Sequence, residues 1–479
     1  MPKTYLKRTK IVATISSLNC TEQLIRDLFE AGMDVARLNT AHMTVDDAAV
    51  VVGTIRKVSD RIAILIDTKG PNIRSGAMEP LSLKEGEEVC IYCSAKPEEG
   101  KAFPVNYSRF AAEVSPGQHV LIDDGEMELE ILRRERDTLL CRALNDGIVY
   151  QHKSINVPGA KLKAPALTER DRQFIQFAIE NDLDFIAHSF VRSRDDVMAV
   201  QSLLDTADSP IQIIAKIENR EGVDHLESIM DSCAGIMVAR GDLGIEIPLE
   251  EVPIIQKKII YECMVRRKVV ITATQMLQSM VDNPRPTRAE VSDVANAVFD
   301  GTDAVMLSGE TAQGKYPVKA VQMMSRIIHE TELTGNSHFV RPEKVHDAGE
   351  PVTSYIVKMA IQSGDFLPVK AIISNTASGN SCRTIAAYRG TIPVFALSYK
   401  PTVVRQLALS YGVHPTLSEY MDSPNELLKK SVELLLDEKK IGRDDLIVLI
   451  GKHLAQDSAS LCGILKAGSI LDGSEASIR

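Results

Sequence analysis

Two short segments carry residue types that could do chemistry together. They are the runs Ile213–Asn219 (IIAKIEN) and Ala239–Gly244 (ARGDLG). Because side chains alternate between the two faces of a strand, Lys216 and Glu218 share one face. If the two strands are parallel neighbours, Asp242 reaches the same level. Two carboxylates and an ammonium at one end of a sheet suit a divalent cation and a negatively charged substrate, and a surface salt-bridge cluster is the alternative.

The elements that must position these residues follow a regular pattern. Eight apolar, strand-like segments alternate with helical patterns, several of which have plausible N-caps such as Thr168 and Thr287. The segments are apolar on both faces, which is typical of parallel strands covered by helices. Eight such units predict an α/β fold of the (β/α)8 TIM barrel type. The segments are 10–15, 35–39, 62–67, 185–190, 211–217, 235–239, 269–273 and 304–307.

Polar side chains come directly after seven of the eight predicted strands. A TIM barrel places its active site at this end of its strands. A random surface would not repeat this placement, so the pattern favours a functional site over a surface salt-bridge cluster. The residues are Arg37 and Asn39, Asp67 and Lys69, Ser189 and Arg192, Lys216 and Glu218, Arg240 and Asp242, Thr274 and Gln275, and Ser308 and Glu310.

Two further regions do not belong to the barrel pattern. Residues 71–165 lose the helical rhythm and show short alternating runs with hairpin signals, which predicts an inserted, β-barrel-like lid domain. The barrel then comprises residues 1–70 and 166–340. After a polar linker, residues 350–479 read as a C-terminal α/β domain, for which a regulatory role is one option. Its predicted strands are 370–374, 394–397, 413–416 and 446–450, with an antiparallel fifth near 464–470.

Composition narrows the class of protein. The chain has 479 residues and a net charge of −10, which disfavours nucleic acid or an anionic membrane as partner. It has no apolar run of the roughly 18 residues that a transmembrane helix needs. The basic, polar N-terminus lacks the apolar core of a signal peptide. We therefore expect a cytoplasmic protein.

Several motifs, taken in order, resemble pyruvate kinase over essentially the whole chain. The resemblance implies Mg²⁺-dependent (or Mn²⁺-dependent) phosphoryl transfer from phosphoenolpyruvate to ADP, which gives pyruvate and ATP in the last step of glycolysis. It also implies a homotetramer. The motifs are Thr9–Ile15 (TKIVATI), Gly32–Asn39, Asp67–Pro71 (DTKGP), Ile214–Asn219, Ala239–Gly244, Thr272–Leu277 (TATQML), Pro286–Ala297 and Asp303–Thr311 (DAVMLSGET).

The resemblance also implies a role for each matching residue. Glu218 and Asp242 would hold Mg²⁺, and Lys216 would stabilise charge on the transferred group and the enolate oxygen. The backbone at Gly241 and Asp242 would bind the substrate carboxylate, together with Thr274. The remaining implied residues are Arg37 for phosphate, Ser308 and Glu310 near the proton path, and Arg74, Lys153, His42 and Asn39 for the nucleotide.

The chain departs from the family pattern at its monovalent-cation site. The family uses Asn39, Asp67 and the Thr68 carbonyl, with a serine where this chain has Ala41. Asn72 replaces the glutamate that accompanies K⁺ dependence and the lysine that accompanies K⁺ independence. Whether this enzyme needs K⁺ therefore stays open.

Other departures concern the nucleotide and effector sites. Ser16–Ser17 and Met43 stand where the family has glycine and proline, so nucleotide preference could differ. The loop Thr376–Ser381 has the look of a phosphate-binding helix start, but Asn380 replaces a common arginine, and the later loop Gly451–Asp457 does not match. An activator site and an ordinary helix cap both remain open there.

Two other functions fit the same barrel. A metal-dependent lyase or aldolase that acts through a pyruvate enolate needs Glu218 and Asp242, but it does not need Lys216, Arg74 or a lid lysine. A non-catalytic metabolite sensor would be favoured by loss of the metal pair or Lys216, and none is lost.

Overall fold

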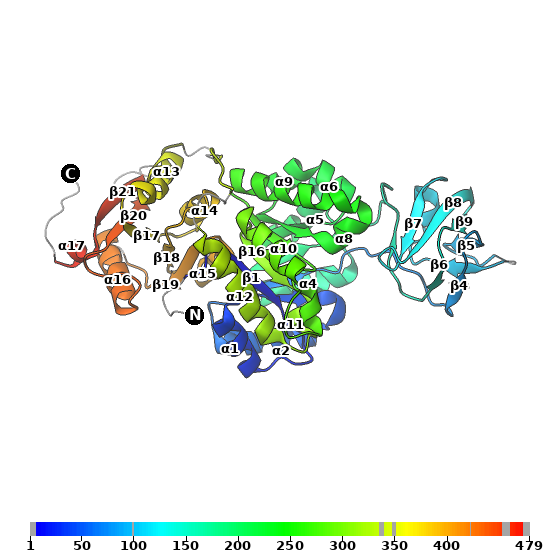
Figure 1. Ribbon diagram of the computed structural model, residues 1–479, viewed down its shortest axis with the longest axis horizontal. Coiled ribbons are helices and arrows are strands. Elements are labelled where there is room, and N and C mark those ends of the chain that lie inside the picture. The colour runs from blue at the N-terminus through cyan, green and yellow to red at the C-terminus, as the bar shows by residue number, and fades with distance from the viewer. Residues whose placement is uncertain are drawn as a thin grey trace.

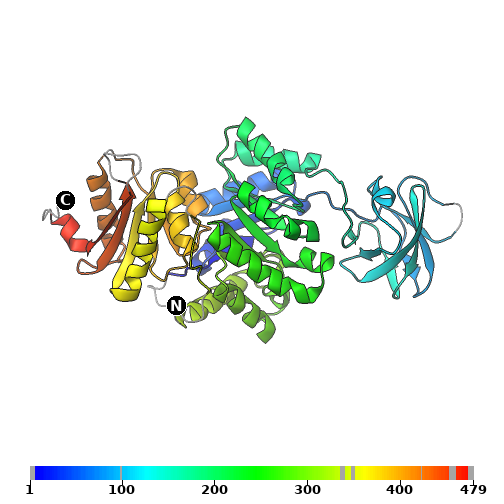
Figure 2. The same ribbon diagram turned by 90° about the horizontal axis from the view of Figure 1, so that it is seen from above.

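The computed structural model describes residues 6–97, 100–334, 340–346, 351–421, 423–452 and 460–472. The molecule is elongated, with a barrel at its centre (Figure 1). An inserted β-rich unit lies at one end of the barrel and a C-terminal α/β unit at the other, and the view from above keeps this order (Figure 2). The segment that leads into the insert and the segment that returns from it therefore lie at the same end of the barrel.

The barrel confirms the predicted fold class. Among the described residues, eight parallel strands close in the order β1-β16-β15-β14-β13-β12-β3-β2. The side chains inside it are apolar and buried, as in a packed core rather than a pore. The strands are β1 (Lys10–Thr14), β2 (Val35–Asn39), β3 (Ala63–Asp67), β12 (Phe185–His188), β13 (Gln212–Ile217), β14 (Gly235–Ala239), β15 (Val269–Ala273) and β16 (Ala304–Leu307).

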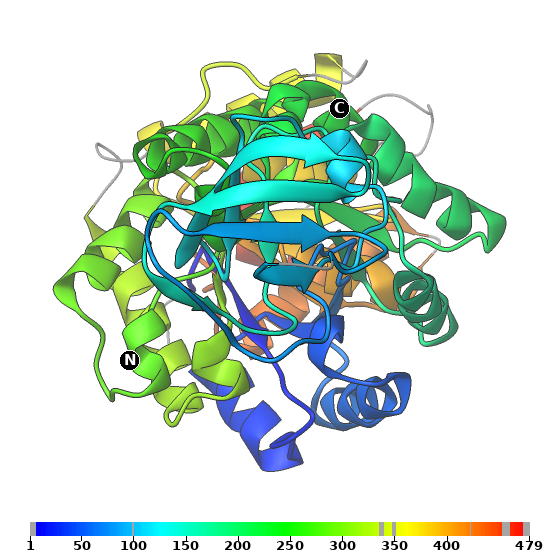
Figure 3. The same cartoon turned by 90° about the vertical axis from the view of Figure 1, so that its right-hand side faces the viewer.

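Helices surround the barrel, as the view from the insert side shows (Figure 3). Thr168 and Thr287 are N-caps, each in a capping box with the residue three positions on. The elements are α1 (Glu22–Ala31), η1 (Thr40–His42), α2 (Val45–Val58), α4 (Glu169–Glu180), α5 (Arg194–Thr206), α6 (Arg220–Asp224), α7 (Leu226–Ser232), α8 (Arg240–Glu246), η2 (Leu249–Glu251), α9 (Val252–Val265), η3 (Gln278–Val281), α10 (Arg288–Phe299), α11 (Gly309–Ala312) and α12 (Pro317–Leu333).

The inserted unit has its own apolar core. It contains a six-stranded sheet in the order β11-β7-β8-β9-β5-β6 and a two-stranded sheet of β10 and β4. Asp123, Asp124 and Gly125 form a tight hairpin turn with positive φ, as the sequence predicts. The elements are β4 (Leu81–Leu83), β5 (Glu88–Tyr92), β6 (Ala102–Pro104), α3 (Phe110–Glu113), β7 (His119–Ile122), β8 (Met127–Glu135), β9 (Thr138–Ala143), β10 (Gly147–Val149) and β11 (Ile155–Asn156).

The C-terminal unit is a five-stranded sheet in the order β19-β18-β17-β20-β21, in which β21 alone is antiparallel to its neighbour. Ala408 and Leu409 of this unit belong to the apolar cluster inside the barrel, so the unit closes the amino-terminal end of the barrel strands. Its elements are α13 (Pro351–Phe366), β17 (Val369–Asn375), α14 (Asn380–Ala387), β18 (Val394–Ser398), α15 (Pro401–Leu407), β19 (Val413–Leu417), α16 (Pro424–Asp437), β20 (Leu446–Lys452), β21 (Ser460–Lys466) and α17 (Ala467–Leu471).

Three expected elements differ from the structure. The strand expected near 464–470 begins earlier, and its second half is helix α17, because α17 begins where the pairing of β21 with β20 ends at Lys466. The sequence pattern also predicts a single helix over 223–230, and the structure has two helices that meet at His225. The strand expected to reach Phe190 ends at His188, and Phe190 has a positive φ of 56°, which no strand residue adopts.

A buried ion pair joins the barrel to the C-terminal unit. Arg389 Nη2 lies 2.6 Å from Asp303 Oδ2, and the two side chains are 2% and 1% exposed. The other oxygen of Asp303 accepts a hydrogen bond from the backbone N–H of Tyr411 at 2.9 Å. Burial raises the pKa of Asp303, and Arg389 opposes this by stabilising the charged carboxylate.

Replacing Arg389 with methionine is expected to destabilise the protein by about 3–5 kcal/mol, because it leaves the Asp303 carboxylate buried and uncompensated. The free energy of unfolding in urea measures this. Arg443→Met is the matched control, since Arg443 and Asp472 are 56% and 62% exposed, and its loss should stay below about 1 kcal/mol. Equal losses in the two variants would contradict the role of the buried pair.

Candidate active site

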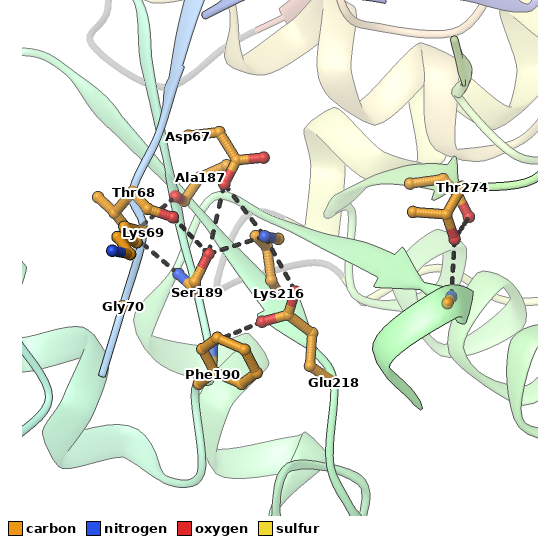
Figure 4. A network of polar contacts seen from close by, with 12 residues as sticks. Asp67, Thr68, Lys69, Gly70, Ala187, Ser189, Phe190, Lys216, Glu218 and Thr274 are labelled. Atoms are coloured by element: carbon orange, nitrogen blue, oxygen red, sulfur yellow. Dashed lines mark hydrogen bonds and ion pairs between the residues drawn. The ribbon is translucent and has the colours of Figure 1, made fainter. Parts of the chain in front are cut away.

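Lys216 is the centre of the polar cluster at the carboxyl end of the barrel strands (Figure 4). Its Nζ lies 2.7 Å from Ser189 Oγ, 2.9 Å from Glu218 Oε1 and 3.1 Å from Asp67 Oδ1. The side chain is only 11% exposed. The contacts with Ser189 and Asp67 are hydrogen bonds and use two of the three N–H donors of the ammonium. The contact with Glu218 is an ion pair, and Glu218 Oε1 is buried with no hydrogen-bond partner among the described residues. Lys216 and Glu218 therefore do share one face, as the alternation along β13 predicts.

The charge of Lys216 is held in place by nearby carboxylates. Burial by itself disfavours the charged ammonium, but Asp67, Glu218 and Asp242 outweigh it and raise the pKa of Lys216. Asp67 also contacts Arg37, whose Nε lies 2.6 Å from Asp67 Oδ2. Burial alone would raise the pKa of Asp67, and Arg37 and Lys216 together lower it. Lys216, Asp67 and Arg37 therefore form an ionised, buried network.

Glu218 is held by the turn that follows β12. The backbone N–H of Phe190 donates to Glu218 Oε2 at 2.6 Å, and the positive φ of Phe190 directs that N–H toward the barrel. Burial raises the pKa of Glu218; Lys216 lowers it, and the nearby Asp242 carboxylate raises it further. Glu218 and Asp242 are thus two carboxylates close enough to repel each other. Together they form an oxygen-donor set that suits Mg²⁺ or Mn²⁺.

Thr274 lies on the neighbouring side of the site and has an unusual backbone. Its φ is +66°, which is rare for a β-branched residue. Its hydroxyl accepts a hydrogen bond from Gly241 N–H at 2.8 Å and donates one to the Ala273 carbonyl at 2.7 Å. Arg240 holds this turn, because Nη2 donates to the Thr274 carbonyl at 2.7 Å. Thr274, Gly241 and Asp242 at the start of α8 are thus brought together.

Glu310 is a buried carboxylate that accepts hydrogen bonds from two backbone N–H groups. It is fully buried. Its Oε1 accepts from the Leu277 N–H at 3.0 Å, and its Oε2 accepts from the Ser308 N–H at 2.7 Å. Glu310 therefore holds together the loops that follow β15 and β16.

The residues predicted for the nucleotide are not gathered around Lys216. Lys153 Nζ lies 2.6 Å from Asp123 Oδ2 within the insert. Arg74 donates to the His152 carbonyl at 2.7 Å, also in the insert. His42 is exposed on η1. Their role in nucleotide binding stays a prediction.

The oxygens predicted to hold K⁺ already have protein donors. Both oxygens of Asp67 are paired with Arg37 and Lys216. The Thr68 carbonyl accepts from Ser189 Oγ at 2.6 Å, and Asn39 Oδ1 accepts from the Ala41 N–H at 3.1 Å. As arranged here, this set does not fit a cation, because positive groups and N–H or O–H donors occupy it.

The loop Thr376–Ser381, which the sequence analysis considers as an effector site, makes the contacts of an ordinary helix start. Thr376 Oγ1 accepts from the Gly379 N–H at 2.8 Å, and Gly379 has a positive φ directly before α14. Arg383 donates to the Ser378 carbonyl at 2.9 Å. Most of the second loop, at residues 453–457, lies outside the described residues, so an effector site stays a prediction.

Two functional residues were not identified from the sequence. Phe190 contributes through its backbone, which no side-chain pattern reveals. Asp171 accepts hydrogen bonds from the Lys69 and Gly70 N–H groups at 3.0 and 3.3 Å, and it also caps α4 through Thr168. The Thr168-x-x-Asp171 capping box is a signal that could have indicated a fixed acid at this point.

His188 is the last residue of β12 and directly precedes Ser189. Its buried ring is expected to make the stability of the fold depend on pH. It is 0% exposed, and both ring nitrogens lack a hydrogen-bond partner among the described residues. Burial lowers its pKa to about 4 from an ordinary value of 6.5. The neutral ring is therefore the form that the fold accommodates.

Stability is expected to fall as the pH drops below 6.5, because the unfolded chain then binds a proton that buried His188 cannot accept until the pH nears 4. The two pKa values give a loss of about 2 kcal/mol between pH 8 and pH 5. Urea unfolding of wild type and His188→Gln at both pH values measures it. The variant should lose less stability on acidification, and an identical loss would contradict this prediction.

No helix in the described part of the chain is long and apolar enough to cross a membrane.

Two family models match the sequence: "Pyruvate kinase, barrel domain" over residues 6–321 and "Pyruvate kinase, alpha/beta domain" over residues 354–464. A crystal structure of a pyruvate kinase from Cryptosporidium parvum superposes with a TM-score of 0.89 at 34% identity and covers 96% of each chain.

Curated relatives named pyruvate kinase match most of the chain. The protein from Borreliella burgdorferi is 45% identical over 93% of both chains. That from Clostridium acetobutylicum is 39% identical over 93% of this chain and 96% of its own length. The barrel, the clustered Lys216 and Glu218, and these matches over nearly the full length lead to one conclusion: the chain belongs to the pyruvate kinase family and is a phosphotransferase.

Proposed function

We propose that this protein transfers the phosphoryl group of phosphoenolpyruvate to ADP with Mg²⁺ or Mn²⁺, and so forms pyruvate and ATP in the last step of glycolysis. The observation that carries this proposal is the buried, permanently charged Lys216 between Asp67, Ser189 and Glu218. Phosphoryl transfer depends mainly on positioning and charge stabilisation. A fixed ammonium at the reacting centre supplies both.

Two of the three N–H donors of Lys216 are hydrogen-bonded to Ser189 and Asp67, and the third can serve the substrate once the ion pair with Glu218 opens. Glu218 is the acceptor that a divalent cation also needs, because it and Asp242 form the oxygen-donor pair. We infer that Lys216 then keeps Ser189 and Asp67 and directs its third donor to the phosphoryl group and the enolate oxygen. Mg²⁺ bound by Glu218 and Asp242 would supply positive charge for the substrate oxygens.

Arg37 is placed to bind the substrate phosphate. Its guanidinium is fixed by Asp67 and by Thr14 Oγ1, which lies 2.8 Å from Nη1. Its Nη2 has no hydrogen-bond partner among the described residues, so part of its planar donor set is available for phosphate oxygens. We propose that Arg37 and Lys216 hold opposite sides of the transferred group.

The substrate carboxylate and the proton path belong to the second side of the site. We propose that the Gly241 and Asp242 N–H groups at the start of α8 bind the carboxylate together with the Thr274 hydroxyl. The Gly241 N–H then exchanges its present acceptor, Thr274 Oγ1, for a carboxylate oxygen. The enolate is then protonated through Thr274 or a water chain beside it. Ser308 lies at the end of the same path, and Glu310 fixes its backbone.

The insert would act as a lid over this site. We propose that Arg74 and Lys153 bind the ADP phosphates, with Asn39 and His42 near the nucleotide. Lys153 is now paired with Asp123, so closing the lid must exchange that carboxylate for a phosphate. Both partners are partly exposed, at 38% and 27%, which keeps the cost of the exchange small.

We also propose a cytoplasmic homotetramer. The described part of the surface carries large apolar side chains on α13, where Val352, Tyr355, Met359 and Phe366 are 58%, 66%, 51% and 85% exposed. An apolar surface of this kind on one helix is typical of an interface between subunits.

Lys216→Met is expected to lower kcat by about 10²–10³-fold or more, because it removes the charge that stabilises the transition state. Phosphoenolpyruvate should still bind, which isothermal titration calorimetry measures. ATP formation from phosphoenolpyruvate and ADP with Mg²⁺ measures turnover. Wild-type turnover in the variant would contradict the assigned role, and absence of ATP formation by the wild type would favour a lyase or a sensor.

ATP formation is expected to continue when K⁺ is replaced by tetramethylammonium at equal ionic strength. Arg37 and Lys216 already neutralise Asp67, and Ser189 already donates to the Thr68 carbonyl. The prediction is contradicted if turnover is lost without K⁺ and returns with KCl but not with chloride salts of larger cations. That result would show that these donors rearrange to admit K⁺.

A further inference from the structure

We propose that Thr68 and Ser189 are positioning residues that fix Lys216 and connect its placement to the chain segment that leads into the lid. The inference rests on the proposed phosphoryl transfer, because it concerns how the charge on Lys216 is held in register with the substrate. Thr68 and Ser189 follow the neighbouring strands β3 and β12, so they lie side by side where the lid segment leaves the barrel.

The two residues are joined by reciprocal hydrogen bonds (Figure 4). The Ser189 N–H donates to Thr68 Oγ1 at 3.0 Å, and Ser189 Oγ donates to the Thr68 carbonyl at 2.6 Å. Thr68 is bonded to β12 in turn, since its N–H donates to the Ala187 carbonyl at 3.0 Å. Both side chains are 2% exposed, so water does not compete for these bonds.

The direction of these bonds follows from the charge of Lys216. An ammonium can only donate, so Ser189 Oγ accepts from Nζ at 2.7 Å. The single hydroxyl proton of Ser189 is then free to point at the Thr68 carbonyl, which is closer than Asp67 Oδ1 at 3.3 Å. Lys216 therefore donates a hydrogen bond to Ser189, and Ser189 donates one to the Thr68 carbonyl. This fixed direction gives the ammonium one preferred position.

The adjoining turn leaves no room for adjustment. A Cβ added to Gly70, which has φ +68°, would lie 2.8 Å from the Phe190 ring and 3.0 Å from Ser189 Cβ. Phe190 in turn donates its N–H to Glu218. The segment after β3 is thus packed directly on the two residues that hold Lys216 and Glu218.

The same segment is the exit to the lid. Asp171 Oδ1 accepts from the Lys69 and Gly70 N–H groups where the chain leaves the barrel. Asp171 Oδ2 accepts from the Thr168 hydroxyl at 2.6 Å, where the chain returns from the lid to begin α4. One fully buried carboxylate therefore holds the outgoing and returning segments together. Movement of the lid about this point reaches Ser189 through Thr68 and Gly70.

Steady-state kinetics of three variants of the full-length protein test the proposal. Ser189→Ala is expected to lower kcat about 10- to 100-fold, as loss of a hydrogen bond to a charged group would. The KM for phosphoenolpyruvate should stay within about threefold, because ground-state binding is little changed. Thr68→Val, which keeps the shape but loses the oxygen, should lower kcat in the same way. Thr68→Ser, which keeps the oxygen, should restore it.

A matched control separates positioning from general packing. Ser410 is another fully buried serine, and its hydroxyl has no hydrogen-bond partner among the described residues. It lies beside Leu409 at the opposite end of the barrel, so Ser410→Ala should leave kcat unchanged. If Ser189→Ala does not fold, as judged by circular dichroism, the Thr68→Val and Thr68→Ser pair decides the question.

A second readout tests whether the effect passes through Lys216. Exchange of the pyruvate methyl protons with deuterated water, followed by NMR with Mg²⁺ and inorganic phosphate present, requires enolate stabilisation but no ADP. Ser189→Ala should slow this exchange in parallel with ATP formation. Unchanged kcat in Ser189→Ala and Thr68→Val, or slowed ATP formation with normal exchange, overturns the proposal. A wild-type protein that makes no ATP would instead overturn the proposed function and with it this inference.

Discussion

The buried ammonium of Lys216 is the interaction on which the rest of the site depends. A charge at this depth is stable only because Asp67 and Glu218 lie within ion-pair distance and Ser189 completes its hydrogen bonds. Asp67 in turn requires Arg37, since a buried carboxylate between two cations stays ionised. These residues come from the ends of four strands that are consecutive neighbours in the barrel, β13, β12, β3 and β2, so their carboxyl ends meet at one place.

The barrel provides this arrangement by sealing its other end. Ala408 and Leu409 complete the apolar interior at the amino-terminal ends of the strands, and the Arg389–Asp303 pair holds the C-terminal unit against them. That end is closed by apolar packing and by buried ion pairs between charged groups, so the open carboxyl ends of the strands are where the polar cluster around Lys216 can meet a substrate. The two segments that join the insert to this end of the barrel are held together by Asp171.

Rigidity at the site comes from backbone as much as from side chains. Thr274 and Phe190 both have positive φ, which costs free energy in residues other than glycine. Each places a group of the candidate site, either the Thr274 hydroxyl or the N–H that holds Glu218. Hydrogen bonds from Arg240 and to Glu218 stabilise these turns. Such strain at the carboxyl ends of two barrel strands, β12 and β15, is typical of a preorganised site.

The sequence by itself determined the barrel, its strands nearly to the residue, and the association of Lys216 with Glu218, because the period of apolar side chains and the alternation along a strand are local properties. It also indicated the insert and the family. Only the tertiary structure decided that Ser189 and Phe190 hold the pair, that Asp171 joins the two lid segments, and that Lys153 rests on Asp123. These contacts join residues far apart in the chain through backbone groups and turn geometry, which no spacing of side-chain types encodes.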